Sequence, residues 1–276
     1  MILLKITNIA ELKEIARKVR IGIIEGVYNA KSGHPGGSLS VADILTVLYF
    51  NQMNIDEKNP KSNSRDRLVL SKGHVAPALY SVLAERGYFN KEELKKLRKL
   101  GGMLQGHPDM KNIPGVDMST GSLGQGLSVA NGMAIASKLN HEGVRVYCIC
   151  GDGELQEGQI WEAAMTSSHY KLDNLCVIVD NNNLQIDGNV NEVMSIYPID
   201  EKFKSFGFEV FNIDGHDMNQ IINTLNKAKT IKGKPTAIIA KTIKGKGVSF
   251  MENQAGWHGK APKEEEYNLA MKELQK

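Results

Sequence analysis

Short apolar runs alternate with segments of helical periodicity along most of this 276-residue chain. One run, RLVLS, begins at Arg67, and further runs lie at 144–150, 174–180, 208–213 and 236–241. Their apolar residues are adjacent in sequence, which is typical of parallel strands that are covered on both faces. The pattern therefore predicts an α/β fold, with a doubly wound, mostly parallel sheet of about five strands and helices on both faces.

Helix signals occupy the intervals between these runs. Asn8 and Glu11 resemble a capping box at the start of one helix, and Ser40 with Asp43 is expected to cap another, VADILTVLYF. Later helical patterns are KGHVAPALYSVLAERGYF, IWEAAMTSSHY and DMNQIINTLNKAK. The chain shows no internal repeat, low-complexity segment or clear linker, so residues 1–276 are expected to form a single domain.

The composition excludes several classes of protein. The 34 basic and 31 acidic residues are mixed along the chain, which leaves no basic stripe for nucleic acid and no membrane-surface face. No apolar run approaches the ~20 residues that span a bilayer, and the N-terminal residues turn polar too soon for a signal peptide. We therefore expect a cytoplasmic protein whose three cysteines are reduced.

Two polar motifs follow neighbouring strands of the predicted sheet. Gly-Asp-Gly, centred on Asp152, comes directly after 144–150, and Asn182 follows 174–180 within VIVDNNNLQIDG. One strand–helix–strand crossover brings both to the same edge of adjacent strands. Carboxylate, amide and backbone carbonyl oxygens are the ligands that Mg²⁺ prefers beside phosphate groups. Each motif alone is a common polar turn, but the pair predicts a site for a cation and a phosphate.

Four of the seven histidines lie in glycine- or proline-rich loops: His34, His74, His107 and His258. A lone loop histidine is usually only solvated, so these four indicate a site without fixing its chemistry. The glycine-rich GSLGQG has the wrong glycine order for a dinucleotide fingerprint, and no GK[ST] motif for nucleotide phosphates occurs in the sequence. Nucleotide binding is therefore the weaker interpretation.

The combination of these motifs resembles the transketolase family. GDG followed by NNN is similar to the thiamine diphosphate signature, and SGHPGGSLS, LSKGHVAPALY, GHPD, GSLGQG and GDGELQEGQIWEA look like transketolase motifs. The resemblance runs from about residue 10 to WHGKAP near residue 262, in the family's order and with comparable spacing. It implies the thiamine diphosphate-binding fold, with this chain as the diphosphate-binding domain.

The resemblance also implies the cofactors, which are thiamine diphosphate and Mg²⁺ or another divalent cation such as Ca²⁺ or Mn²⁺. Asp152, Asn182 and the backbone carbonyl of Leu184 match the family's cation ligands. The diphosphate is expected at backbone groups around Gly153, where a helix N-terminus offers free N–H groups.

Further positions match residues that contact the cofactor in the family. Gly121 and Gly124 in TGSLGQG allow close approach of the cofactor. Leu123 is expected to pack on the aminopyrimidine ring, and Ile186 is expected near the thiazolium. Ser122 stands where the family usually has proline, which bears on the stiffness of this loop more than on function.

The resemblance assigns roles to the four loop histidines, which would line the substrate funnel and help to move protons. His34 and His258 are expected to handle protons at the donor carbonyl. His74 matches a position close to the diphosphate, and His107 matches one that binds donor hydroxyls. Glu157 matches the family glutamate that reaches across a subunit interface toward the aminopyrimidine. No chemistry is expected of the remaining histidines, which are His141 and His169 on helical segments and His216 in DGHD.

The implied reaction is transfer of a two-carbon ketol unit from a ketose phosphate to an aldose phosphate, as in the pentose phosphate pathway. Transketolases are normally far longer than 276 residues, and the pyrimidine-binding and C-terminal domains have no counterpart in this sequence. We therefore expect the N-terminal subunit of a split transketolase, inactive alone. Its partner would be a C-terminal subunit that carries the pyrimidine-binding domain, with two copies of each chain.

Two other hypotheses stay open at this stage. The chain could be the cofactor-binding subunit of another thiamine diphosphate enzyme, such as a 2-oxo acid dehydrogenase or a deoxyxylulose-phosphate-type synthase. The GHPGG and SKGH loops favour transketolase over these enzymes. The chain could also be a non-catalytic regulatory subunit, although the retained cation ligands and histidines argue against that.

Overall fold

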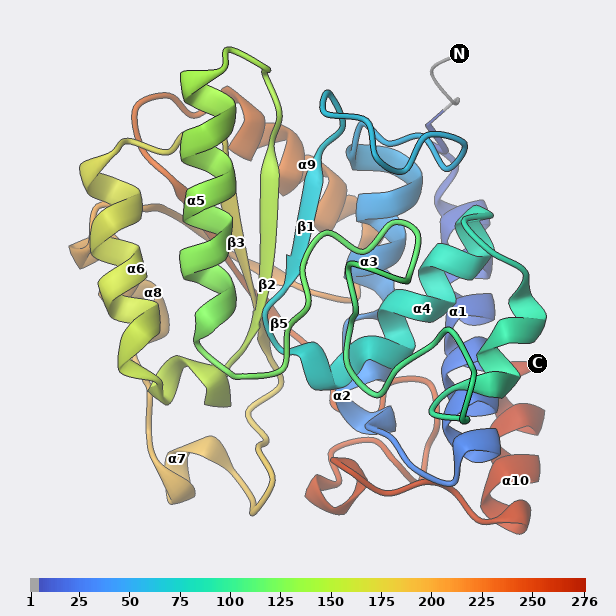
Figure 1. The fold of residues 1–276 in the computed structure, drawn as a ribbon. Helices are drawn as coiled ribbons and strands as arrows, with labels where there is room; N and C mark the ends of the chain where they lie inside the picture. Colours follow the sequence, from blue (N-terminus) through green and yellow to red (C-terminus); the bar gives the residue numbers. More distant parts are fainter. Residues whose placement is uncertain (1–4) are drawn as a thin grey trace.

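A five-stranded parallel sheet forms the centre of the computed structural model, which describes residues 5–276 (Figure 1). The strand order is β1-β2-β3-β5-β4, and every neighbouring pair is parallel. The strands are β1 (Arg67–Leu70), β2 (Val146–Gly151), β3 (Leu175–Asn181), β4 (Glu209–Asp214) and β5 (Thr236–Lys241). The predicted α/β class and the five predicted strands are confirmed.

Helices cover both faces of this sheet (Figure 1). One face carries α1 (Ile9–Ala30), α3 (Ala42–Val47), α4 (Ala76–Arg86) and α9 (Met218–Thr230), with α10 (Glu264–Leu274) packed against α1. The other face carries α5 (Gln125–Leu139), α6 (Gly158–His169) and α8 (Ile199–Ser205). The predicted start of α1 is confirmed, because Asn8 Oδ1 accepts hydrogen bonds from the amides of Ala10 and Glu11.

Short elements complete the chain. Figure 1 places α2 (Pro35–Ser40) and α7 (Val190–Val193) beyond the carboxyl ends of the strands. The 3₁₀ turns are Gly73–Val75, Lys91–Lys96, Gly153–Gln156 and Ala255–Trp257, and a π-helical turn spans Leu48–Gln52. Within residues 5–276, no helix has the length and apolar character needed to cross a membrane.

Side chains along each strand alternate between two hydrophobic clusters, one on each face of the sheet. On β2, Tyr147 and Ile149 pack on the α1 side, whereas Cys148 and Cys150 pack on the α5 side. All four residues are at most 1% exposed, and burying a large apolar side chain stabilises a fold by about 1.5–3 kcal/mol. The two thiols are free, with their sulfur atoms 3.8 Å apart, as expected for reduced core cysteines.

One predicted helix start is wrong. Ser40 was expected to cap a helix together with Asp43, but α2 runs through Ser40 and α3 begins at Ala42. The Ser40 hydroxyl instead donates to Asp180, and the Asp43 carboxylate binds Arg20. Both partners are distant in sequence, so a local pattern of residue types does not reveal them.

A long irregular segment, residues 97–124, joins the α4 region to α5 and is fastened to its neighbours by buried polar contacts. Asp117 accepts from the Arg65 guanidinium and from the Leu68 amide of β1 (2.8 Å). The Tyr80 hydroxyl of α4 donates to the carbonyl of His107 (2.8 Å). These contacts fix a segment without regular structure at the edge of the sheet and thereby place His107.

The structure predicts that Asp117→Ala destabilises the protein strongly. The side chains of Asp117 and Arg65 are 2% and 7% exposed, so the substitution leaves a buried guanidinium without its carboxylate. We expect a loss of about 3–5 kcal/mol in the free energy of unfolding, measured by urea denaturation. Asp56→Ala, which removes a solvent-exposed contact to the Lys58 amide, should cost about 1 kcal/mol or less. Equal losses of stability in the two variants would contradict the assignment of Asp117 as the buried partner of Arg65.

Candidate active site

The carboxyl ends of β2 and β3 bring the two predicted polar motifs together. These strands are parallel neighbours in the sheet. Asp152 follows β2, and its carboxylate accepts hydrogen bonds from the amides of Gly153 (2.8 Å) and Asn183, which lies beyond β3. Asp152 and Asn182 therefore lie at the same edge of adjacent strands, as the crossover argument predicts.

The Asp152 carboxylate is buried and forms no ion pair with a Lys, Arg or His side chain of residues 5–276. The residue is only 2% exposed. Burial, followed by the negative charge of Asp180, raises the pKa of Asp152 to about 7. A divalent cation beside this carboxylate would favour its charged form, so the site suits a cation.

Two further oxygen atoms lie at this edge. The amide nitrogen of Asn182 donates to Asp180 (3.1 Å), which orients the side chain so that its Oδ1 accepts from the Leu184 amide (3.1 Å). Asn182, Leu184 and Asp152 all line one cavity. A carboxylate, an amide oxygen and a backbone carbonyl are hard donors, and each keeps lone pairs for a cation such as Mg²⁺.

Two buried lysines at the same edge were missed by the sequence interpretation. Lys72 follows β1 and pairs with Asp180, and Lys244 follows β5. Burial, followed by the positive charge of Lys72, lowers the pKa of Lys244 to about 8. An anion at this wall would stabilise the charged ammonium of Lys244. The available signal was position, because SKGH and TIKGKG each place a lysine just beyond a predicted strand.

The four predicted histidines come together from four separate segments. The ring centroid of His34 lies 5.2 Å from that of His74, 5.4 Å from that of His258 and 6.5 Å from that of His107. The rings of His74 and His258 are 5.0 Å apart. The structure thus gathers residues that are more than two hundred positions apart in sequence into one cluster.

Burial keeps the imidazoles of this cluster neutral near pH 7. It is the largest cause that lowers the pKa of His34 to about 4, of His258 to about 3 and of His74 to about 2, and a cationic neighbour is the next cause in each case. The pKa of the more exposed His107 is also lowered, first by burial. A neutral imidazole can donate at one nitrogen and accept at the other, so the cluster can relay protons.

A contact fixes the tautomer of His258, whereas one nitrogen of His34 is left without a partner among the described residues. The Lys244 ammonium lies 3.1 Å from Nδ1 of His258. Because an ammonium can only donate, Nδ1 accepts and the hydrogen of the neutral ring is on Nε2. Nδ1 of His34 is buried and has no hydrogen-bond partner among the described residues. Buried polar atoms without partners are uncommon in proteins, so this nitrogen is suited to meet a ligand.

These groups line a cavity of about 360 Å³ at the carboxyl edge of the sheet. Three of the four imidazoles and the three oxygen donors contribute to its wall. Five further residues expected to contact the cofactor or the partner also line it: Gly121, Leu123, Gly153, Glu157 and Ile186. The volume falls within the range of small-molecule sites.

Two expected site residues lie just outside the cavity wall. His107 packs against Gly121, where an added Cβ would lie 3.0 Å from Cδ2 of the imidazole. Gly124 precedes α5 with φ 84°, and its amide donates to the buried carboxylate of Glu154 (2.9 Å). The left-handed backbone explains why glycine is needed at position 124.

The start of α6 differs from the expectation. Gly153 begins a 3₁₀ turn rather than an α-helix, and its amide is not free because it donates to Asp152. Glu157 is the N-cap of α6, and its exposed side chain makes no capping hydrogen bond. His141 was expected on a helical segment but lies in the turn after α5, with φ 54°.

The residues present fit thiamine diphosphate with a divalent cation. The hard oxygen donors suit the cation, the Lys244 ammonium suits the diphosphate, and the His34 nitrogen without a partner among the described residues offers a contact for bound ligand. Within residues 5–276, no three side chains drawn from His, Cys, Asp and Glu are grouped so that they could hold a metal by themselves.

Comparison with known proteins agrees with this arrangement. Residues 12–275 match the family described as transketolase, thiamine diphosphate binding domain. The chain is 46% identical over 266 residues to one subunit of the 6-deoxy-6-sulfo-D-fructose transketolase of a Clostridium strain, covering 96% of this chain and 97% of that protein. It is 44% identical over 259 residues to one subunit of the apulose-4-phosphate transketolase of Phocaeicola vulgatus, covering 94% of this chain and 92% of that protein.

The fold is similar to that of the crystallised transketolase of Campylobacter jejuni. The TM-score is 0.90 and the sequence identity is 38%. The match covers 98% of this chain but 43% of that protein. The chain therefore spans less than half of this transketolase and nearly the full length of the two subunits.

The low pKa of His74 predicts a pH-dependent loss of stability. As the pH falls below about 6.5, the unfolded chain takes up a proton at this position, whereas the folded chain does not until the pH nears 2. Between pH 7 and pH 5 this imidazole should therefore cost about 2 kcal/mol in the free energy of unfolding. In His74→Gln, the decrease between these pH values should be smaller by that amount in urea titrations. An unchanged decrease would show that His74 is protonated in the folded protein.

Proposed function

This chain belongs to the transketolase family, and from that membership we propose that it is the N-terminal, diphosphate-binding subunit of a split transketolase. The proposed activity is transfer of a two-carbon ketol unit between sugar phosphates. The observation that carries the proposal is the shared cavity wall on which Asp152, Asn182 and Leu184 lie together with three neutral imidazoles. These are the residues to which the family resemblance assigns the cation and the proton-handling imidazoles.

The cation and the diphosphate belong to one wall of the cavity. The Asp152 carboxylate, Asn182 Oδ1 and the Leu184 carbonyl would hold Mg²⁺, which usually shares its shell with phosphate oxygens and water. The ammonium of Lys244 lies 3.4 Å from the Leu184 carbonyl. It would therefore reach a diphosphate whose oxygen atoms bind the same cation as this carbonyl. When bound, thiamine diphosphate supplies the ring that accepts the electron pair released as a carbon–carbon bond breaks.

Proton handling is assigned to His34 and His258. His258 accepts from Lys244 at Nδ1 and so presents its Nε2–H as a donor for a substrate oxygen. Nδ1 of His34 has no partner among residues 5–276 and can accept a proton or donate one, depending on its tautomer. His74 contacts both rings at the diphosphate side, and the more exposed His107 would bind donor hydroxyls. All four would act as neutral groups near pH 7.

A partner chain is favoured by the surface beside the cavity. Ile186, Val193 and Met194 lie on the segment after β3 and are 66%, 43% and 63% exposed. Large apolar side chains exposed on one segment beside a binding cavity favour a surface that another chain covers. Glu157 is exposed at the same cavity, where it would face the partner's pyrimidine-binding domain. We infer that the partner is a C-terminal subunit, with two copies of each chain.

The sugar specificity of the two relatives of similar length bears on the substrate. One is named for 6-deoxy-6-sulfo-D-fructose and the other for apulose 4-phosphate. Both share the length and much of the sequence of this chain, so the cofactor motifs do not fix the sugar. A role in the pentose phosphate pathway stays a prediction, which a screen of donor and acceptor sugars with the reconstituted complex would test. A cytoplasmic location also stays a prediction, and imaging of the tagged chain would test it.

The cation site predicts the effect of Asp152→Asn. The variant keeps the size of the side chain but removes the one carboxylate among the three proposed ligands, so Mg²⁺-dependent affinity for thiamine diphosphate should fall by about 100-fold or more. Calorimetric titration in Mg²⁺ and in EDTA measures this difference, with the partner chain present in both cases.

Asp187→Asn is the matched control, because Asp187 is an exposed carboxylate that lines the same cavity. It should leave the affinity within about threefold of wild type, since an exposed charge contributes little. If Asp152→Asn binds the cofactor as tightly as this control, Asp152 is not a cation ligand.

The split arrangement predicts that the chain alone does not transfer ketol units. Adding a C-terminal transketolase subunit should restore activity, because that chain would supply the pyrimidine-binding domain. Glu157→Ala should lower both the affinity between the chains and the turnover of the assembled enzyme. Steady-state assays across a range of mixing ratios, with analytical ultracentrifugation, measure both effects. Full activity of this chain by itself would refute the arrangement.

A further inference from the structure

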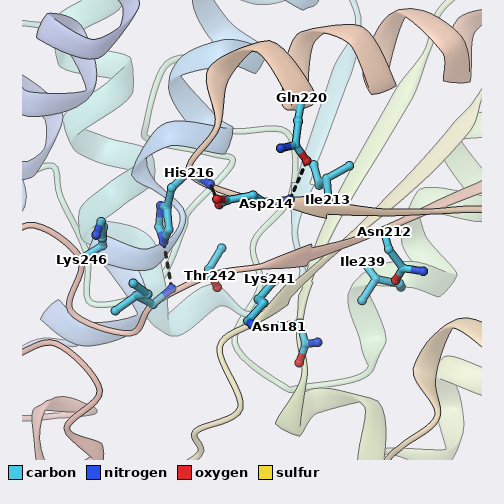
Figure 2. A pocket seen from close by; sticks show the side chains of 11 residues that line it. Asn181, Asn212, Ile213, Asp214, His216, Gln220, Ile239, Lys241, Thr242 and Lys246 are labelled. Carbon is cyan, nitrogen blue, oxygen red and sulfur yellow. Dashed lines mark hydrogen bonds between the residues drawn. The ribbon is translucent and has the colours of Figure 1, made fainter.

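A second hollow, of about 600 Å³, lies at the carboxyl ends of β4 and β5 (Figure 2). His216, from the DGHD motif, is on its wall together with Thr242 and Lys246. Figure 2 shows the imidazole directed toward the backbone that follows Thr242. The proposed reaction gives His216 no role, although its side chain is only 13% exposed.

Both nitrogens of the His216 ring are engaged, and the contacts define its tautomer. Nε2 lies 2.9 Å from the Ile243 amide nitrogen and must accept, because a backbone N–H can only donate. The hydrogen of the neutral ring is therefore on Nδ1, which donates to Asp43 (2.8 Å). His216 thus joins the chain after β5 to helix α3.

The contact continues through a buried ion pair. Asp43 accepts two hydrogen bonds from the guanidinium of Arg20, at 3.0 and 2.6 Å. The remaining nitrogen of that group, Nε, donates to the Lys246 carbonyl (3.0 Å). Arg20 and Asp43 are 8% and 6% exposed, so this pair is shielded from water. This series of contacts therefore begins at the Ile243 amide, passes through His216, Asp43 and Arg20, and ends at the Lys246 carbonyl.

Lys244 lies between these two anchor points. Its side chain enters the cofactor cavity, where the ammonium contacts His258 (3.1 Å) and the Leu184 carbonyl (3.4 Å). The next residue, Gly245, has φ 83°, and an added Cβ would lie 2.2 Å from the Met251 carbonyl oxygen. The segment consequently makes a tight turn that needs fixed ends to keep the ammonium at the wall.

We propose that His216, acting with Asp43 and Arg20, is a positioning residue that clamps residues 243–246 and so holds Lys244 in the cofactor site. The assignment of Lys244 to a diphosphate rests on the proposed function, whereas the clamp itself does not. His216 touches neither substrate nor cofactor and acts only through the backbone.

The tautomer is tested on the wild-type chain. Long-range ¹H–¹⁵N NMR correlations should show His216 neutral, with its hydrogen on Nδ1 and an unprotonated Nε2. An Nε2–H tautomer or a protonated ring at pH 7 would overturn the proposal, because neither can accept from the Ile243 amide.

Hydrogen exchange of the Ile243 amide tests the clamp in variants of the full chain. His216→Phe removes both ring contacts and should speed this exchange by about tenfold, as expected for the loss of one hydrogen bond. His216→Gln keeps one acceptor and one donor and should restore most of the protection. Asn212→Ala, on the wall of the same hollow but outside the clamp, should exchange like wild type. Unchanged exchange in His216→Phe refutes the proposal. If that variant does not fold, His216→Ala takes its place: exchange about tenfold faster than in Asn212→Ala supports the clamp, and equal exchange refutes it.

A double-mutant cycle separates positioning from general stability. His216→Phe should weaken binding of thiamine diphosphate with Mg²⁺ by about tenfold, but by less than about twofold when Lys244 is already methionine. Equal effects in both backgrounds would show that His216 does not act through Lys244. A wild-type chain that fails to bind the cofactor with its partner present would refute the proposed function, and the exchange result would then decide the clamp by itself.

Discussion

One buried carboxylate, that of Asp180 at the end of β3, ties the carboxyl edge of the sheet together. The residue is fully buried, and it accepts hydrogen bonds from the Lys72 ammonium, the Ser40 and Thr242 hydroxyls and the Asn182 amide. Burial alone would raise the pKa of Asp180, but Lys72 and the hydroxyls outweigh it and lower the pKa. These partners come from the segments after β1 and β5, from helix α2 and from the end of β3 itself. A charge that must be fully compensated thus forces four segments into one arrangement.

The consequence is an uneven distribution of charge at this edge. Asp180 pairs with the ammonium of Lys72 and orients the amide of Asn182. Within residues 5–276, by contrast, Asp152 accepts only from backbone amides, and burial raises its pKa to about 7. The Asp152 carboxylate, which has no cationic partner among the described residues, and the oriented Oδ1 of Asn182 are therefore the two groups that would stabilise a bound cation most. Lys244, whose ammonium lies 3.4 Å from the Leu184 carbonyl at the same wall, supplies positive charge for a diphosphate. The fold therefore places an anion site next to a cation site within one cavity.

The sequence predicted the architecture because adjacent apolar residues of buried parallel strands are a local signal, and all five strands were located from it. The proximity of Asp152 and Asn182 could be predicted because one strand–helix–strand crossover brings the ends of two consecutive parallel strands to the same edge of the sheet. The gathering of the four histidines did not follow from their loops and rested on family resemblance. Ser40 was misassigned as a helix cap because its real partner, Asp180, is 140 positions away. The role of His216 was missed because its partners, Asp43 and the Ile243 amide, are distant in sequence. Lys72 was missed although its place just beyond a predicted strand was a usable signal.

We propose above all that Asp152, Asn182 and the Leu184 carbonyl bind one divalent cation beside the diphosphate. Crystals of the full chain with its partner, grown with thiamine diphosphate and Mn²⁺ in place of Mg²⁺, test it through the anomalous scattering of manganese. We expect a single peak in this cavity at about 2.0–2.3 Å from all three oxygen atoms and from diphosphate oxygens. A peak among the imidazoles, or bound cofactor with no manganese at these oxygens, would contradict it.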